Sequence, residues 1–265
     1  MNVYCDLTRR FNAGRARAIL AGGQAVVLHR LAIMSKDGDW ILREDEETLT
    51  YVLSTLEACG ARYRFGAPLD ARWLRAGWSS HLEYTVDGLR VRTDFVTRPP
   101  RLDGCQLARL WAEAEGHDVP FVPARQLVDL KKTNREKDYA VIGELARRLD
   151  NPEEQLLCSR SARDILALAE KHPGFIDALH AQRPVLGAVA AGREALEAAL
   201  DAERRMLIRV NEDRLARYAD AAGKWTARWP DVERAVRALP LREAHEIMVR
   251  EASGVLPFQV PGGWP

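Results

Sequence analysis

Three aspartates in two short segments carry the strongest chemical signal in this sequence. Asp37 and Asp39 flank a glycine in Ser35–Trp40, and Asp94 interrupts the apolar, β-branched segment Val91–Val96. Alternate residues of a strand face the same way, so Asp37 and Asp39 repel each other unless a cation separates them. Magnesium prefers oxygen ligands, and an unpaired carboxylate such as Asp94 is costly in an apolar strand. These three side chains therefore predict a metal site.

Carboxylates from two strands can hold two magnesium ions roughly 4 Å apart. Such a pair activates a hydroxyl nucleophile and stabilises a leaving pyrophosphate. The alternative for Asp37-Gly38-Asp39 is a simple turn before a strand, because two aspartates at this spacing also occur by chance.

A pair of glycines, Gly22-Gly23, precedes the aspartates. It lies between the apolar segment Arg17–Ala21 and the helix-compatible segment Gln24–Ala32, which predicts a strand, a tight turn and a helix. Glycine lets a ligand approach the backbone closely, and the start of a helix offers free N–H groups to phosphate. A triphosphate could lie at Gly22-Gly23 while its metal lies on the aspartates. A plain tight turn is the alternative.

The segments around these residues predict a unit of strands and helices. Strands are predicted over residues 39–43, 62–65, 78–86 and 89–97. Asp87-Gly88 separates the last two and is typical of a two-residue hairpin turn. A helix is predicted over Glu44–Gly60, because Leu49, Val52 and Leu56 recur at helical spacing.

After residue 104 the sequence predicts helices, over 107–115, 128–150 and 192–225, with Pro230 ending the last. The fold class is therefore α+β: a mixed sheet with flanking helices in residues 1–150, followed by an all-helical domain in residues 151–265. One alternative is a helical interaction protein whose first half is a scaffold. In that case the C-terminal helices would form a homo-oligomer, and changing Leu200 and Leu207 to aspartate would abolish association.

Composition narrows the class of protein. The chain has 265 residues, a formal net charge of +1, and 47% hydrophobic and 29% charged residues. These values are typical of a globular protein and give no general sign of nucleic-acid binding. The four cysteines are widely spaced without a C-x-x-C pair, which predicts reduced thiols rather than disulfides or zinc. We expect a cytoplasmic protein without a membrane span, because no long uncharged apolar run occurs.

Four segments follow one another between roughly residues 15 and 150. They are Leu20–Ala25, Ser35–Asp39, Val91–Phe95 and Leu127–Ile142. The last contains Lys131 and Asp138, whose spacing would place them on one face of a helix. Together these segments resemble the nucleotidyltransferase superfamily with a polymerase-beta-like fold. Within it, they most resemble the bacterial nucleotidyltransferases related to the abortive-infection, type IV toxin group.

This resemblance implies magnesium-dependent transfer of a nucleotide from a nucleoside triphosphate to an acceptor hydroxyl. The acceptor could be RNA, a protein or a small molecule, and the resemblance suggests a toxin–antitoxin context. It assigns catalysis and the binding of one or two magnesium ions to Asp37, Asp39 and Asp94. It assigns nucleotide binding to Gly22, Gly23, Ser35, Lys131 and Asp138. From the residues alone, Lys131 and Asp138 could instead belong to an exposed, salt-bridged helix face.

Some positions depart from the family pattern. Ile33 and Met34 stand where an arginine is frequent, and Val141 stands where an aspartate is frequent. Gly23 replaces a common serine, and Arg30 a common glycine. The departures at Ile33 and Val141 favour a second hypothesis, in which a catalytically weakened member of the fold acts by binding nucleotide or a partner.

Basic and aromatic residues alternate in one further region. Arg62, Arg64, Arg72 and Arg75 are interleaved with Tyr63, Phe65 and Trp73. Such a region can bind RNA by charge and stacking. The alternative is a solvated edge of the sheet.

Overall fold

The computed structural model describes residues 2–260 and divides into two compact units. The first comprises the chain up to Val122 and from Arg214 on, and the second comprises Pro123–Asp213. The sequence predicted a boundary at residue 150 instead. The difference arises because the last helices return to the first unit, where Trp225 and Met248 are buried in its core.

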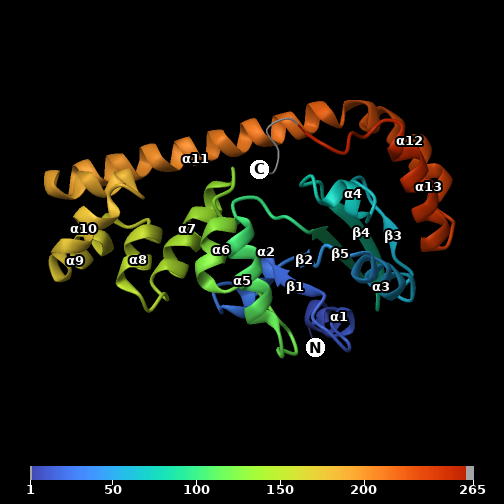
Figure 1. Cartoon of the computed structure of the whole chain (residues 1–265), viewed down its shortest axis with the longest axis horizontal. Coiled ribbons are helices and arrows are strands. Elements are labelled where there is room, and N and C mark those ends of the chain that lie inside the picture. The colour runs from blue at the N-terminus through green and yellow to red at the C-terminus, as the bar shows by residue number, and fades with distance from the viewer. Residues whose placement is uncertain (1, 261–265) are drawn as a thin grey trace. The chain divides into compact units, whose positions relative to one another are not determined.

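Five strands form one mixed sheet in the first unit, in the order β1-β2-β5-β4-β3 (Figure 1). β2 pairs parallel with β5, and the other neighbours are antiparallel. The strands are β1 (Ala18–Ala21), β2 (Asp37–Leu42), β3 (Arg62–Tyr63), β4 (Ser80–Val86) and β5 (Leu89–Val96). The α+β class is confirmed, and the hairpin turn lies at Asp87-Gly88 as predicted, with positive φ at both residues.

The helices of the first unit surround this sheet. They are α1 (Val3–Phe11), α2 (Gly22–Leu28), α3 (Glu46–Glu57), α4 (Ala71–Leu74), α5 (Gly104–Ala114), the end of α11 (Arg193–Ala221), α12 (Gly223–Val236) and α13 (Leu241–Ser253). Helix α3 begins where the Asp45 side chain accepts a hydrogen bond from the Thr48 amide. That cap, with two glutamates in the first turn, favours the start of a helix there.

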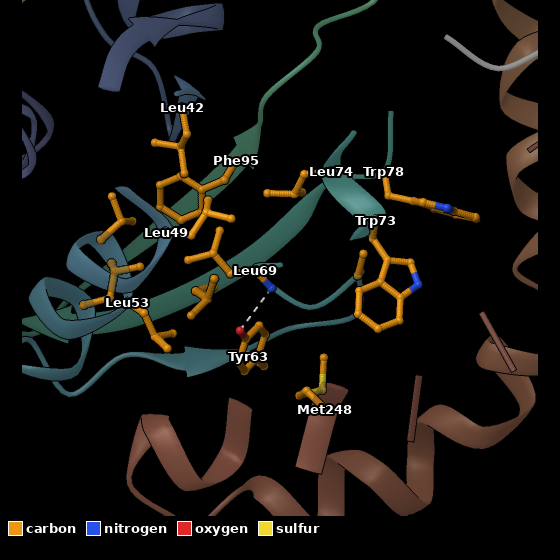
Figure 2. Close-up of a cluster of buried hydrophobic side chains, with 14 of the residues drawn as sticks. Leu42, Leu49, Leu53, Tyr63, Leu69, Trp73, Leu74, Trp78, Phe95 and Met248 are labelled. Atoms are coloured by element: carbon orange, nitrogen blue, oxygen red, sulfur yellow. Dashed lines mark hydrogen bonds between the residues drawn. The ribbon is translucent and has the colours of Figure 1, made fainter. Parts of the chain in front are cut away.

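The sheet has one apolar and one polar face, because alternate residues of its strands differ in character. On the apolar face, Trp40 stacks on Phe95, and Phe11 of α1 packs edge-on against both rings. The Trp40 indole donates to Thr8 Oγ1 at 2.9 Å. Leu49 and Leu53 of α3 point toward this core in Figure 2. Each large side chain buried here contributes about 1.5–3 kcal/mol.

Helix α12 contains Pro230 instead of ending before it. The prediction that Pro230 stops the helix was therefore wrong. Proline removes one hydrogen bond, here to the Thr226 carbonyl, but packing of a helix can outweigh that cost. Trp225 is buried and its indole donates to the Gly66 carbonyl at 3.0 Å. Trp229 packs edge-on against Phe65, so both tryptophans fix α12 to the first unit.

Helix α13 packs on α3 and β3 and brings His245 to Tyr63. Tyr63 Oη lies 2.7 Å from His245 Nδ1 and also accepts a hydrogen bond from the Leu69 amide (Figure 2). Burial lowers the pKa of His245 below 6.5, although the charges of Asp70 and Glu246 oppose that shift.

We expect this shift to make stability depend on pH. The unfolded histidine binds a proton near its ordinary pKa of about 6.5, whereas the folded one resists protonation. The free energy of unfolding should therefore fall as pH decreases below about 6.5. Denaturant titrations should show that the free energy of unfolding falls less between pH 7.5 and pH 5.5 in His245→Gln than in the wild type. His117→Gln, at an exposed position, is the control, and an equal loss in all three proteins would contradict the assignment.

The second unit is helical. Its elements are α6 (Ala124–Leu130), α7 (Glu136–Ala146), α8 (Pro152–Cys158), α9 (Ala162–Lys171), α10 (Pro173–Leu179), a 3₁₀ helix (Pro184–Ala191) and the start of α11. Leu200 is buried in its core. Aspartate at Leu200 would therefore disrupt this core, so that substitution does not test association specifically. Over residues 2–260 we find no helix with the length and apolarity that crossing a bilayer requires.

Candidate functional site

The polar face of the sheet carries a row of residues that runs across four strands. Ala21 of β1 pairs with Asp39 of β2, Asp39 with Asp94 of β5, and Asp94 with His81 of β4. Register partners on neighbouring strands lie on the same face, with the strands about 4.8 Å apart. The parallel pairing of β2 with β5 thus brings Asp39 and Asp94 side by side. Asp37 lies one strand step away on the same face, opposite Arg92.

The glycine pair lies directly beside this row. Gly22 adopts a φ of +56°, and a Cβ atom built on it would lie 1.8 Å from Asp39 Oδ2. A Cβ on Gly23 would lie 2.2 Å from Ser35 Oγ. The backbone at Gly22-Gly23 therefore approaches Asp39 and Ser35 more closely than any residue with a side chain would permit. The structure thus brings Gly22 to Asp39 and Gly23 to Ser35, and phosphate binding at the glycines stays a prediction.

Asp94 and Asp37 have basic neighbours. Asp94 Oδ1 lies 2.6 Å from His81 Nδ1 and 3.2 Å from Arg64 Nη1. Asp37 Oδ1 lies 3.4 Å from Arg92 Nη1. Asp94 and Asp37 keep 24% and 41% of their side-chain surface exposed, so neither pair is in a dry interior.

Metal binding by Asp37, Asp39 and Asp94 stays a prediction. Among residues 2–260, no three carboxylate, imidazole or thiol side chains are gathered where they could hold a metal ion. The physical reason is local. The backbone brings Asp37, Asp39 and Asp94 to one face, but Asp37 and Asp94 are turned toward their basic partners.

Asp37 also influences the residue behind it. Tyr4 donates from Oη to the Lys36 carbonyl at 2.7 Å. Burial raises the pKa of Tyr4, and the negative charge of Asp37 raises it further. The phenol therefore stays protonated and holds the start of β2 in place.

His81 and Ser79 extend the row beyond Asp94, and neither was predicted as a site residue. Ser79 Oγ lies 2.9 Å from His81 Nε2. The signal was present in the hairpin: a two-residue turn at Asp87-Gly88 pairs residues at equal distances from it, and His81 and Asp94 are such a pair. Ser79 lies two residues before His81, so the alternation of side chains along an extended chain places both on one face.

Two pockets adjoin this end of the row. One, of about 260 Å³, is lined by Ser79 and His81 together with aromatic residues that include Trp78 and Tyr218. The other, of about 530 Å³, is lined by several arginines, of which Arg64 reaches Asp94.

The alternating basic and aromatic region is largely paired internally. Each of the four arginines contacts a carboxylate; the pairs are Arg62–Glu83, Arg64–Asp94, Arg72–Asp70 and Arg75–Glu44. Burial opposes ionisation of Glu83, but hydrogen bonds from Arg90 and Arg62 outweigh it and lower its pKa. Binding of RNA by this region stays a prediction.

Lys131 and Asp138 belong to the second unit and pair with each other. Lys131 Nζ lies 3.6 Å from Asp138 Oδ1, and both side chains are less than one-tenth exposed. The pair is therefore buried, not an exposed helix face. The prediction of one continuous helix was wrong, because Lys131 follows α6 and Asp138 lies in the first turn of α7.

A local hydrogen-bond network interrupts the helix between them. Thr133 Oγ1 donates to Asp138 Oδ2 at 2.6 Å and accepts from the Arg135 amide at 3.1 Å. Threonine side chains that bond to nearby backbone in this way compete with helix continuation. The predicted contact of Lys131 and Asp138 with nucleotide stays a prediction.

Comparison with known proteins gives limited similarity. No protein-family model and no curated protein matches the chain. The crystal structure of JHP933 from Helicobacter pylori is 13% identical, with 80% of this chain and 92% of that chain covered at a TM-score of 0.38. A presumed nucleotidyltransferase from the same organism is 13% identical, with 79% and 95% covered, also at 0.38. At this identity and score, neither similarity assigns a role to any residue here.

Proposed function

We propose that the chain is a magnesium-dependent nucleotidyltransferase, which moves a nucleoside monophosphate from a nucleoside triphosphate to an acceptor hydroxyl. The supporting observation is the in-register row of Asp39 and Asp94, with the Gly22 backbone against Asp39. A phosphate chain needs an open backbone on one side and carboxylates that hold its cation on the other. Here the Gly22 backbone lies against Asp39, and Asp94 lies beside Asp39 on the neighbouring strand.

The residues of the row have distinct roles in this proposal. Gly22 and Gly23 let the backbone lie against Asp39 and Ser35, so that the start of α2 would offer its N–H groups to the β- and γ-phosphates there, with the Ser35 hydroxyl next to Gly23. Asp39 and Asp94 face the α-phosphate, and Asp37 supports them from the same strand. Arg64 and Arg92 would move from the carboxylates toward phosphate oxygens, because a doubly charged cation replaces their charge.

The donor set fits magnesium in its chemistry. Three carboxylates on one face of adjacent strands supply the hard oxygen ligands that the ion requires. The fit requires Asp37 and Asp94 to leave their basic partners, which partial exposure of both side chains allows. When bound, magnesium would supply charge neutralisation on the phosphates and orient them for in-line attack.

A second candidate function has its own supporting observation. Arg64 and His81 both contact Asp94, and Arg92 contacts Asp37. If these pairs persist with nucleotide present, the chain would bind the triphosphate without transferring it. It would then act as a nucleotide sensor or through a partner.

The two candidates separate in one experiment. The purified chain is incubated with α-³²P-labelled ATP, GTP, CTP or UTP, total cellular RNA and protein extract, with or without magnesium. Transfer predicts magnesium-dependent label on an acceptor and release of pyrophosphate. Sensing predicts that magnesium and triphosphate together raise the unfolding temperature, by mass action on the folded state, without transfer. The absence of label, pyrophosphate and stabilisation with all four nucleotides would contradict both candidates.

A further inference from the structure

The pocket of about 260 Å³ in the first unit has no role in either candidate function. Its walls come from the segment before β4, the end of α11 and the start of α12, which supply Trp78, Tyr218 and Trp225 respectively. Aromatic rings hold flat ligands through contacts with their faces and edges. The volume lies just below the range that begins at about 300 Å³ for sites of drug-sized molecules. A ligand of one or two fused rings therefore suits the pocket.

The polar atoms of these three rings are bonded within the protein. Each ring donates a hydrogen bond to a backbone carbonyl, at 2.9 Å from Trp78, 3.0 Å from Trp225 and 2.6 Å from Tyr218. Trp78 and Tyr218 also pack edge to face, with their centroids 4.9 Å apart. These contacts fix the orientation of the rings before a ligand binds. Preorganisation of this kind lowers the entropic cost of binding.

A positively charged side chain, Arg214, lines the same pocket. Its Nε is buried without a hydrogen-bond partner among residues 2–260, and its guanidinium carbon lies 5.2 Å from the centre of the Tyr218 ring. Burial lowers the pKa of Arg214; Tyr218 opposes this shift, and the charge of Arg217 adds to it. A guanidinium that is partly removed from water and lies near a second positive charge is stabilised by an anion.

The shape of the Arg214 side chain favours a carboxylate as this anion. A guanidinium presents its N–H groups as a planar fork, which matches the two oxygens of a carboxylate. A phosphate also accepts from such a fork, but a nucleotide brings a sugar as well as a base and a phosphate. The small volume of the pocket favours the smaller ligand.

We propose that this pocket binds a small aromatic carboxylate, with its rings against Trp78, Tyr218 and Trp225 and its carboxylate on Arg214. The proposal goes beyond the proposed function, because none of these four side chains takes part in nucleotidyl transfer. It also needs no magnesium and no movement of Asp37 or Asp94, so it holds or fails independently of the transferase.

Calorimetric titrations of the full chain with indole-3-carboxylate and indole-3-carboxamide test the proposal. The two probes share one ring system and differ in charge. We expect the acid to bind with a dissociation constant of about 1 mM or below. It should bind at least about 10-fold more tightly than the amide, because hydrogen bonds to a charged group are the stronger ones. Arg214→Gln should abolish this preference and leave binding of the amide unchanged.

Two further variants show where the probes bind. Ala219→Leu adds bulk to the lining of the pocket and should weaken binding of both probes about 10-fold or more. Arg209→Gln removes an exposed arginine of α11 that is not part of this lining, and it should bind both probes like the wild type. Unfolding temperatures show whether each variant is folded.

Several outcomes would overturn the proposal. They are equal affinity of the wild type for acid and amide, acid binding that is unchanged in Arg214→Gln or Ala219→Leu, and no binding of the acid up to about 10 mM. CMP and AMP are titrated as the other source of an anion on an aromatic ring. If either binds more tightly than the acid and is lost in Arg214→Gln, the pocket is a nucleotide subsite and the carboxylate assignment is wrong. These titrations contain neither magnesium nor triphosphate, so their failure leaves the proposed function intact.

Discussion

Replacing Asp39 by asparagine should reduce nucleotidyl transfer by about 100-fold or more, because the row of residues across the polar face of the sheet loses its central negative charge. An amide has the shape of the carboxylate but binds magnesium far more weakly. Removal of a single preorganised electrostatic group typically costs about 100- to 1,000-fold in rate. Asp39 is the carboxylate that lies between the Gly22 backbone and Asp94, so no neighbour can take its place. Initial rates of pyrophosphate release measure the effect.

The same substitution should leave the fold intact. Asp39 and Asp94 are direct partners on paired strands, and like charges in that position destabilise a sheet. Without magnesium, the free energy of unfolding of Asp39→Asn should therefore be unchanged or higher by up to about 1 kcal/mol. Stabilisation by magnesium and triphosphate should be lost. A large drop in stability would instead indicate a structural role for Asp39.

Asp87→Asn is the matched control for this experiment. Asp87 lies in the turn between β4 and β5 with a φ of +50°, a conformation that asparagine adopts readily. The change in charge is the same, but the residue is outside the row. Transfer by Asp87→Asn should equal that of the wild type. If Asp39→Asn were as active as Asp87→Asn, the proposed function would have to be abandoned.

The sequence contained enough information for the central part of this site. Asp37 and Asp39 were placed on one face by strand periodicity, and the Asp87-Gly88 turn fixed the register of β4 and β5. The parallel pairing of β2 with β5, which brings Asp39 to Asp94, was not predicted. Strand order depends on contacts between distant segments, and periodicity carries no information about them.

Other features depended on side-chain contacts that a one-dimensional pattern does not reveal. Arg92 and His81 are on strands next to those of Asp37 and Asp94, and Arg64 follows β3, so these ion pairs were not predicted. Pro230 was expected to end a helix, but Trp225 and Trp229 hold it by packing. The interruption at Thr133 arises from side-chain hydrogen bonds to local backbone, and propensity alone favoured a continuous helix there.

Alanine at Gly22 should reduce transfer about 100-fold, whereas alanine at Gly60 should leave it unchanged. Both glycines have positive φ, +56° and +68° respectively, so alanine costs about 1–2 kcal/mol of backbone strain at either position. The two positions differ in space. A Cβ on Gly60 meets nothing within 4 Å, whereas one on Gly22 would lie 1.8 Å from Asp39 Oδ2 and 2.5 Å from its Cγ.

The Asp39 side chain must therefore move when Gly22 carries a methyl group. Either its carboxylate leaves the row, or the strands shift at a further cost of about 1–3 kcal/mol. In both cases the space for the phosphates beside Asp39 closes, and we expect a loss of about 100-fold in pyrophosphate release. Denaturant titration measures the loss of stability that backbone strain causes in both variants. The difference between their rates of pyrophosphate release then gives the effect of the contact with Asp39. Equal rates in Gly22→Ala and Gly60→Ala would show that close approach of the backbone to Asp39 has no part in the reaction, and the phosphates would then have to bind elsewhere on this face.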